Sequence, residues 1–471
     1  RDRSPSRGLG DVYKRQLLIG LRKIEQIAKK VKGIVKINMP IWKTKERITP
    51  NRTGNVSICK LAKRKKYYMR ILLAILFCIL PQAKGADWLN WRGPKYDGIS
   101  AEKLPSDLPK SLPVVWTTEV GTGFCTVSVQ GGRVLTMGNA KGKDTVWCLN
   151  ATDGRVLWKH TYDCPLDPRY YEGGPGGTPT IYGRSVYTLS KKGHAFRLDL
   201  ETGKVIWGRD LVQEHGFKLP EWSFAGSPFI YRDTVILSVG RQAVALNLKD
   251  GATQWMPSTE TSGYATMVPF NDNEHLYFSA KSLMGISLKN GAAKWAYPWK
   301  GLNAADPVSL GNHQLLVSSS IGTSILDVSS GKPIEKWKQR NLRWYFNPGV
   351  VIGKHVYSIH GTTHRPTELV CTELKTGKTV WSKGGYGSGG MIAAGNDVIV
   401  FDKGTLTIFE ASPEKFKLRL RQQVMKGKCW TSPVIVNGRI YCRNATGTLT
   451  CLTLEGDHRS DEAGGDNPKN P

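Results

Sequence analysis

Aromatic side chains, with a few charged ones, stand just before short β-strand patterns at wide intervals along the chain. The set comprises Phe124, Glu172, Trp222, Phe224, Tyr264, Asp306, Trp344, Tyr345, Tyr386 and Trp430. If these strands surround one axis, the aromatic faces would line a common mouth that could hold a planar cofactor, a peptide or a sugar. The alternative interpretation is that the rings only fill the space around the axis.

Two insertions carry further candidates for such a mouth, His160 to Gly177 and Leu211 to Trp222. Both are expected to pass over the same end of the fold, so we predict a contact surface there. Its predicted members are Arg169, Tyr170, Tyr171, Glu172, Glu221, Trp222, Tyr264, Trp344, Tyr345, Tyr386 and Trp430.

Other groups that could do chemistry do not form a recognisable site. His360 and His364 lie four apart in a loop, where that spacing defines no shared face, so we interpret them as solvated residues and not as metal ligands. No cysteine spacing is typical of zinc. No Ser-His-Asp set can be assembled from the sequence. We therefore predict no catalytic residue and no metal site.

A repeated unit must position the mouth residues. Tryptophan recurs as Trp116, Trp158, Trp207, Trp255, Trp295, Trp337 and Trp381, and a Gly-containing turn such as Thr202-Gly203 precedes most of them. Four short strands per period of 40 to 50 residues are typical of a β-propeller. Eight copies of an apolar strand dipeptide predict an all-β, eight-bladed β-propeller of four-stranded antiparallel blades over residues 114–454.

The ends of the repeat array are incomplete. Thr431 to Leu454 supplies three strands, and Val114 to Val120 is a strand with no blade before it. We predict that Val114–Val120 is the outer strand of the last blade, which closes the ring and leaves no open sheet edge. The Pro- and Gly-rich leader over residues 86–113 is expected to lie across the outside of the propeller.

Charge is concentrated at the front of the chain. The whole sequence carries 67 Lys and Arg against 38 Asp and Glu, but residues 1–68 alone hold 20 basic and 4 acidic side chains. The remainder shows no basic cluster, so we predict no nucleic-acid binding. Basic residues, the apolar run Ile71 to Leu80 and small residues follow one another, which predicts a signal peptide over residues 69–85.

This leader organisation predicts an exported protein of the bacterial periplasm or cell envelope, monomeric and without a membrane span after cleavage. Residues 1–68 are interpreted as a non-native or wrongly extended upstream segment, and the polar residues 455–471 as a disordered tail. Seven cysteines follow residue 86. Cys442 and Cys451 would face each other across a two-residue turn, so they either form a disulfide or remain free and buried.

The phrases GTPTIYGRSVYTLS…LDLETGKVIW and SPVIVNGRIYCRNATGTLTCLTL resemble the pyrroloquinoline-quinone (PQQ) repeat of eight-bladed propellers. The family is similar to the propeller lipoprotein of the outer-membrane β-barrel assembly machinery. The resemblance implies one of two functions. A quinoprotein alcohol or sugar dehydrogenase would require PQQ, Ca²⁺, a catalytic Asp and a disulfide between adjacent cysteines.

No two cysteines are adjacent in this chain, and Glu172 and Asp306 are the only acidic candidates for the channel itself. The second function is a non-catalytic envelope propeller without a cofactor that binds or scaffolds a protein or peptide. The sequence favours this binding role over an enzymatic one.

Overall fold

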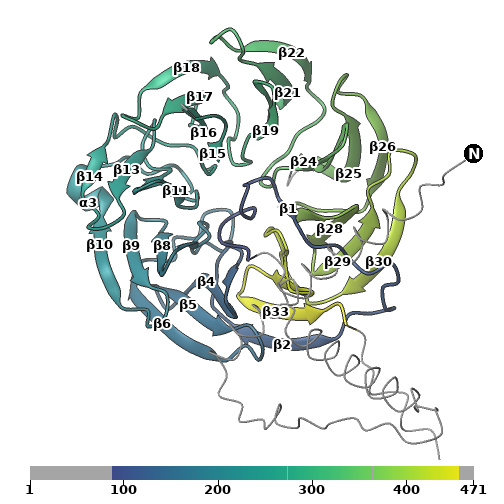
Figure 1. The fold of residues 1–471 in the computed structure, drawn as a ribbon, viewed down its shortest axis with the longest axis horizontal. Helices are drawn as coiled ribbons and strands as arrows, with labels where there is room; N and C mark the ends of the chain where they lie inside the picture. The colour runs from purple at the N-terminus through teal and green to yellow at the C-terminus, as the bar shows by residue number, and fades with distance from the viewer. Residues whose placement is uncertain (1–86, 273, 363–364, 456–471) are drawn as a thin grey trace, which may run out of the picture. The chain divides into compact units, whose positions relative to one another are not determined.

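The computed structural model describes residues 87–272, 274–362 and 365–455. The predictions for residues 1–68, for the signal peptide, for His364 and for nearly all of the tail lie outside these ranges. Eight antiparallel sheets are arranged around one axis (Figure 1), and β1 adds a parallel fifth strand to one of them. The prediction of an all-β, eight-bladed propeller is confirmed.

Blades 1 to 4 follow one another in chain order. Their strands are β3 (Ser128–Gln130), β4 (Arg133–Ala140), β5 (Lys143–Asn150) and β6 (Val156–Asp163); β7 (Thr180–Tyr182), β8 (Ser185–Leu189), β9 (His194–Asp199) and β10 (Val205–Asp210); β11 (Phe229–Tyr231), β12 (Thr234–Leu237), β13 (Val244–Asn247) and β14 (Thr253–Trp255); and β15 (Val268–Pro269), β16 (Glu274–Phe278), β17 (Ser282–Ser287) and β18 (Ala293–Pro298).

Blades 5 to 8 complete the ring. Their strands are β19 (Val308–Gly311), β20 (Gln314–Ser319), β21 (Gly322–Asp327) and β22 (Ile334–Gln339); β23 (Val350–Ile352), β24 (His355–Thr362), β25 (Arg365–Glu373) and β26 (Thr379–Gly384); β1 (Ile99–Ser100), β27 (Gly390–Ala394), β28 (Asp397–Asp402), β29 (Thr405–Glu410) and β30 (Lys417–Gln423); and β31 (Val434–Val436), β32 (Arg439–Arg443), β33 (Thr448–Thr453) and β2 (Val114–Glu119).

The last blade contains strands from both ends of the propeller. Its strand order is β2-β33-β32-β31, and β2 runs antiparallel to β33 with Thr117 opposite Thr450. The Thr117 and Thr450 hydroxyls lie 3.2 Å apart across this pair. Because β2 is the outer strand here, the last blade is four-stranded and antiparallel, like blade 1 beside it.

The repeated tryptophans join each blade to the next, and we call six of them the docking tryptophans. Each is on an outer strand and donates its indole N–H to a backbone carbonyl of the following blade at 2.8 to 3.2 Å. Most of the rings pack on a turn glycine with positive φ, where a Cβ atom would come within 3 Å of the ring. The six are Trp116, Trp158, Trp207, Trp255, Trp337 and Trp381.

Short polar side chains join the inner strands in a similar way. The backbone N–H of Thr126 donates to the Thr178 hydroxyl, Thr178 N–H to the Ser227 hydroxyl, Ser227 N–H to the Thr266 hydroxyl, and Thr266 N–H to the Asp306 carboxylate, at 2.7 to 3.1 Å. Each residue stands just before the inner strand of its blade. The chain of hydrogen bonds therefore fixes the entry points of five successive blades around the axis.

Only one helix occurs in the described part of the chain, α3 (Leu211–His215). It lies in the second insertion and begins at Asp210, whose side chain accepts a hydrogen bond from Gln213 N–H. Among the described residues, no helix combines the length and apolar character that crossing a bilayer requires.

The leader crosses the inside of the ring, so the expectation that it lies outside the propeller is wrong for its first half. Trp88 exchanges backbone hydrogen bonds with Val129 of blade 1, and Ile99 of β1 pairs with Ala393 of blade 7. Between them the buried Arg92 donates to the carbonyls of Pro348 and Gly349 at 3.2 and 2.9 Å. Figure 1 shows this segment passing across the centre. We call this end of the channel the floor.

The predicted path across the outside of the propeller is observed only for the second half of the leader, where Leu112 exchanges hydrogen bonds with Gln422 of the outer strand β30. The error in the first half has a physical cause. Gly and Pro interrupt regular structure, but they do not prevent a segment from entering a channel when its polar groups find partners there.

The disulfide between Cys442 and Cys451 is not formed. Tyr441 is opposite Cys451, and Cys442 is opposite Thr450. This register differs by one residue from the predicted one, so the two side chains point to opposite faces of the sheet. All seven cysteines after residue 86 are free and buried, as the alternative interpretation had it.

Candidate functional site

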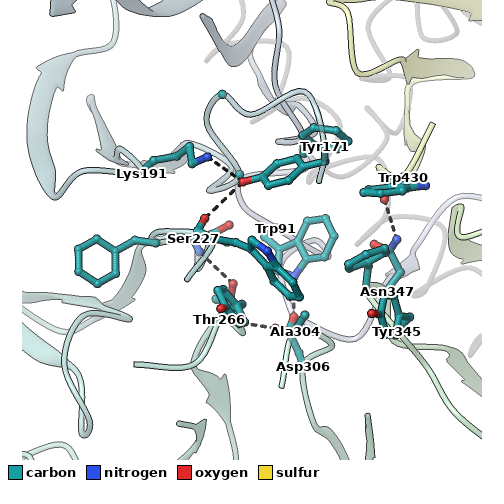
Figure 2. A pocket seen from close by; sticks show the side chains of 18 of the residues that line it. Trp91, Tyr171, Lys191, Ser227, Thr266, Ala304, Asp306, Tyr345, Asn347 and Trp430 are labelled. Carbon is teal, nitrogen blue, oxygen red and sulfur yellow. Dashed lines mark hydrogen bonds between the residues drawn. The ribbon is translucent and has the colours of Figure 1, made fainter. Parts of the chain in front are cut away.

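A pocket of about 630 Å³ opens at the end of the channel opposite the floor, and we call it the mouth pocket. Its walls are the segments that enter the inner strands of seven blades. The leader contributes Trp91, and the hairpin between β8 and β9 contributes Lys191 (Figure 2). Its lining residues include Phe124, Arg169, Tyr170, Tyr171, Trp222, Phe224, Tyr264, Asp306, Tyr345, Phe346, Lys428 and Trp430.

Aromatic rings form a continuous wall on one side of the mouth pocket. Trp430 stacks on Phe346 at a centroid distance of 4.6 Å and lies 5.4 Å from Phe124. Phe124 in turn meets Tyr171 edge-on at 5.3 Å. Trp222 and Tyr264 form a second pair at 5.4 Å. These residues come from several blades, so ring closure brings the wall together.

Three cationic side chains line the mouth pocket. Lys428 pairs with Glu172 at 2.9 Å and sits 4.5 Å above the Trp430 ring. Arg169 is mostly exposed and approaches Asp167. Lys191 is only 2% exposed and donates to the Tyr171 hydroxyl at 2.7 Å. Burial lowers the pKa of Lys191 to about 8, against the attraction of Asp167.

The carboxylate of Asp306 lies where the leader meets the pocket. Trp91 Nε1 donates to one oxygen at 2.5 Å, and Thr266 N–H donates to the other at 2.7 Å. Burial raises the pKa of this carboxyl to about 6, although the nearby Arg92 cation and these hydrogen bonds oppose the shift. Asp306 therefore fastens the leader to the fifth blade.

The first insertion and the residue after the second hold non-glycine residues in the left-handed backbone region. Asp167, Tyr170 and Ser223 have φ of 50°, 62° and 64°. This conformation costs about 1 kcal/mol or more for a residue with a Cβ atom, and such strain is concentrated at functional sites. Asp167 is held by Lys192 at 2.6 Å, whereas the Tyr170 side chain is 88% exposed at the rim of the pocket.

Most predicted contact residues lie together. Arg169, Tyr170, Tyr171, Trp222, Tyr264, Tyr345 and Trp430 all line the mouth pocket. Glu172 is at its edge through Lys428, and Glu221 is exposed beside Trp222 without lining the pocket.

Trp344, Tyr386 and His360 differ from the predictions. Trp344 is fully buried and donates to His360 Nε2 at 3.3 Å, so it offers no contact surface. Tyr386 packs in the core between blades 6 and 7. His360 is buried beside Trp344 and is not solvated, and burial lowers its pKa to about 3. Neighbouring residues in an entering segment alternate between the pocket and the core, which the pattern of residue types did not reveal.

Four important residues were missed by the sequence reasoning, namely Trp91, Lys191, Phe346 and Lys428. Phe346 and Lys428 are next to predicted residues, so widening each segment by two positions would have included them. Lys191 is in a turn that reads as solvent-exposed. Trp91 could not be found without knowing the path of the leader.

The mouth pocket does not offer the ligands that Ca²⁺ needs. This ion takes six to eight oxygen ligands, usually with several carboxylates. Asp306 is the only carboxylate among the lining residues, and both of its oxygens already accept hydrogen bonds. Within the described ranges, no three His, Cys, Asp or Glu side chains come together as a metal site. The residues present therefore do not fit the Ca²⁺ of a quinoprotein.

Known proteins share this fold. The chain is 23% identical over 300 residues to the outer membrane protein assembly factor BamB of Yersinia pestis, which covers 58% of this chain and 72% of that protein. The crystal structure of BamB from Moraxella catarrhalis superposes with a TM-score of 0.56 at 18% identity, covering 74% of this chain and 99% of that one.

Quinoprotein structures have the same architecture. The quinohemoprotein alcohol dehydrogenase of Comamonas testosteroni superposes with a TM-score of 0.59 at 16% identity, covering 83% of this chain and 84% of that one. At such low identities, these likenesses show the fold alone. The family model of the outer membrane protein assembly factor BamB (PQQ_2) matches residues 113–273 and 173–383, more than half of the sequence. The chain therefore belongs to this family of PQQ-like propellers.

Proposed function

We propose that this protein is a non-catalytic propeller of the bacterial cell envelope that binds a segment of another envelope protein in the mouth pocket. The proposal rests on one residue at the rim of the pocket, Tyr170. Tyr170 is exposed, has positive φ and lines the same pocket as the wall of aromatic rings. An exposed aromatic side chain in a strained backbone costs stability, so a contact with a partner would account for it.

The size and composition of the pocket favour a peptide segment as the ligand. A pocket of about 630 Å³ has room for a few side chains. Tyr and Trp supply most of its wall, and these residues provide much of the binding energy in protein interfaces. The name of the Yersinia pestis relative, outer membrane protein assembly factor, supports an envelope protein as the partner.

A PQQ-dependent dehydrogenase is the alternative function raised by the sequence. The donor set of the mouth pocket gives it no support, because the one lining carboxylate, Asp306, is occupied by Trp91 and Thr266. Incubation of the purified protein with PQQ and Ca²⁺, followed by an assay of dye reduction with alcohols and sugars, tests this alternative directly. We expect no substrate-dependent reduction.

Site-specific photo-crosslinking in cells tests the binding function. A photoreactive amino acid at Tyr170 should give discrete adducts with envelope proteins, and Trp430→Ala should reduce their yield. Tyr182 provides a matched position, because it is also exposed but lies at the far end of β7, the strand that follows the insertion containing Tyr170. Equal adducts from both positions, or adducts unaffected by Trp430→Ala, would show that the mouth pocket is not the binding site.

A further inference from the structure

Lys191 is a buried cation that makes no direct ion pair in the part of the chain that the structure describes. It is 2% exposed, and its ammonium group donates to the Tyr171 hydroxyl and to the backbone carbonyl of Asp167, at 2.7 and 3.3 Å. Among the described residues, it forms no ion pair, and its third N–H has no protein acceptor. A buried charge of this kind is costly unless an opposite charge is supplied.

The acidic groups that line or edge the pocket are engaged elsewhere, and the buried Asp144, which also attracts Lys191, forms no ion pair with it and accepts a hydrogen bond from Asn139. Asp167 pairs with Lys192 at 2.6 Å, and Glu172 pairs with Lys428 at 2.9 Å. Asp306 receives hydrogen bonds on both oxygens. The lining of the pocket therefore carries three cationic side chains and one carboxylate, whose oxygens each already accept a hydrogen bond.

The surroundings of Lys191 define what could accompany an anion. Its ammonium group lies 4.8 Å from the centre of the Tyr171 ring, and Tyr171 contacts Phe124 edge-on at 5.3 Å. Figure 2 shows the amino group directed toward the Tyr171 hydroxyl inside the pocket. A carboxylate that reaches Lys191 would place the adjoining part of its ligand along this aromatic wall.

We propose that the mouth pocket recognises a peptide by a carboxylate next to an aromatic side chain, with Lys191 as the group that reads the carboxylate. This inference rests on the proposed function and adds the chemistry of the bound segment. The carboxylate has two possible sources, a free chain terminus and an Asp or Glu side chain.

Fluorescence anisotropy with labelled hexapeptides tests the proposal. One peptide ends in Phe with a free carboxylate, the second is its C-terminal amide, and the third is an amide with Glu before the Phe. We expect the wild-type protein to bind the first or the third at least about tenfold more tightly than the second, because a charge-assisted hydrogen bond is lost with the amide. The preferred peptide identifies the source of the carboxylate.

Lys191→Met should abolish this preference while keeping an apolar stem of similar length. The preference of the wild-type protein between acid and amide peptides does not depend on any variant, so the proposal stays testable if Lys191→Met fails to fold. Lys338→Met is the matched control, because Lys338 also sits over an aromatic ring, Trp299, at 4.5 Å but is on the outer strand β22. It should leave the preference unchanged.

The other outcomes separate the two proposals. Equal binding of all three peptides to the wild-type protein would overturn the carboxylate inference and leave the proposed function standing. A preference retained in Lys191→Met would also overturn it. If no peptide binds but PQQ, which is itself an aromatic carboxylate, does, both proposals fail.

Discussion

The docking tryptophans at the outer strands and the aromatic residues of the mouth pocket use the same side chains for different purposes. Each docking tryptophan repeats one contact, as Trp207 does by donating to the Leu248 carbonyl and packing on Gly251 of the next blade. The aromatic residues of the mouth pocket share no repeated contact. Trp430 stacks on Phe346, whereas Trp222 faces Tyr264. Periodic aromatics hold this ring together, and aperiodic ones are where a function specific to this chain can reside.

The backbone shows the same contrast. Gly203 and Gly251 have positive φ and lack a Cβ atom where a docking tryptophan packs, so the strained conformation is assigned to the residue that tolerates it. At the mouth, Asp167, Tyr170 and Ser223 adopt positive φ with a side chain. Positive φ on residues with a side chain also occurs in hairpin turns such as those at Lys141 and Asn437, but Tyr170 combines it with an 88% exposed aromatic ring.

Removal of one tryptophan from each region should have the largest and most different effects. Trp207→Ala should lower the free energy of unfolding by about 3–5 kcal/mol, because a buried ring and its hydrogen bond are lost. Trp430→Ala should lower it by about 1 kcal/mol, because this ring is only half-buried. Denaturant titration of both variants measures the difference. A comparable loss in the two would mean that the mouth aromatics form a second packing layer.

Asp306 should give the mouth a pH dependence that the outer contacts lack. Its pKa is raised to about 6, so between about pH 4 and 6 the folded protein holds a proton that the unfolded chain has released. The stability contribution of Asp306 therefore falls as the pH rises through this window, by about 3 kcal/mol.

Asp306→Asn should remove that slope, because the amide does not titrate. Denaturant titrations of both proteins from pH 4 to 7 provide the measurement. The difference between the two pH profiles isolates Asp306, because the other carboxylates that titrate in this range contribute to both proteins. Parallel profiles would show that Asp306 has an ordinary pKa and that water reaches its carboxylate in the folded protein.

Tyr170→Gly should change the free energy of unfolding only slightly, and in the opposite direction from the two tryptophan variants. It relieves the positive φ and loses little packing, so stability should rise by about 1 kcal/mol while binding at the mouth weakens. Tyr182→Gly is the control, because Tyr182 is exposed in the regular strand β7, where glycine costs about 1 kcal/mol. Thermal unfolding with the crosslinking assay measures both effects. If Tyr170→Gly destabilises, Tyr170 has a structural role.

The repeated parts of the molecule could be predicted from the sequence because their contacts recur at a fixed period. Trp158 and Gly203 appear in the sequence as copies of Trp207 and Gly251, so recognising one contact predicts the others. The mouth could be predicted in part, because an entering segment always reaches the axis. Which of its residues face the pocket depends on local backbone geometry. That is why Trp344 next to Tyr345 was misplaced.

The leader could not be predicted, because its partners lie far away in the sequence and follow no pattern. Arg92 is satisfied by the carbonyls of Pro348 and Gly349, and carbonyl groups leave no signature in a sequence. The prediction that Cys442 and Cys451 face each other was wrong for a related reason. A shift of one residue in the turn reverses which side chains face each other, and turn length was an assumption.

The pairing of β2 with β33 has a consequence for how the chain folds. A ribosome makes β2 before the other seven blades and its partner strand β33 last, so the edge of β2 stays unpaired while those blades are synthesised. Pairing between segments so remote in sequence is slow, and waiting edges invite association with other chains. We therefore expect the yield of refolding to fall as the protein concentration rises, and a holding chaperone to help most before Thr448–Thr453 has paired with β2.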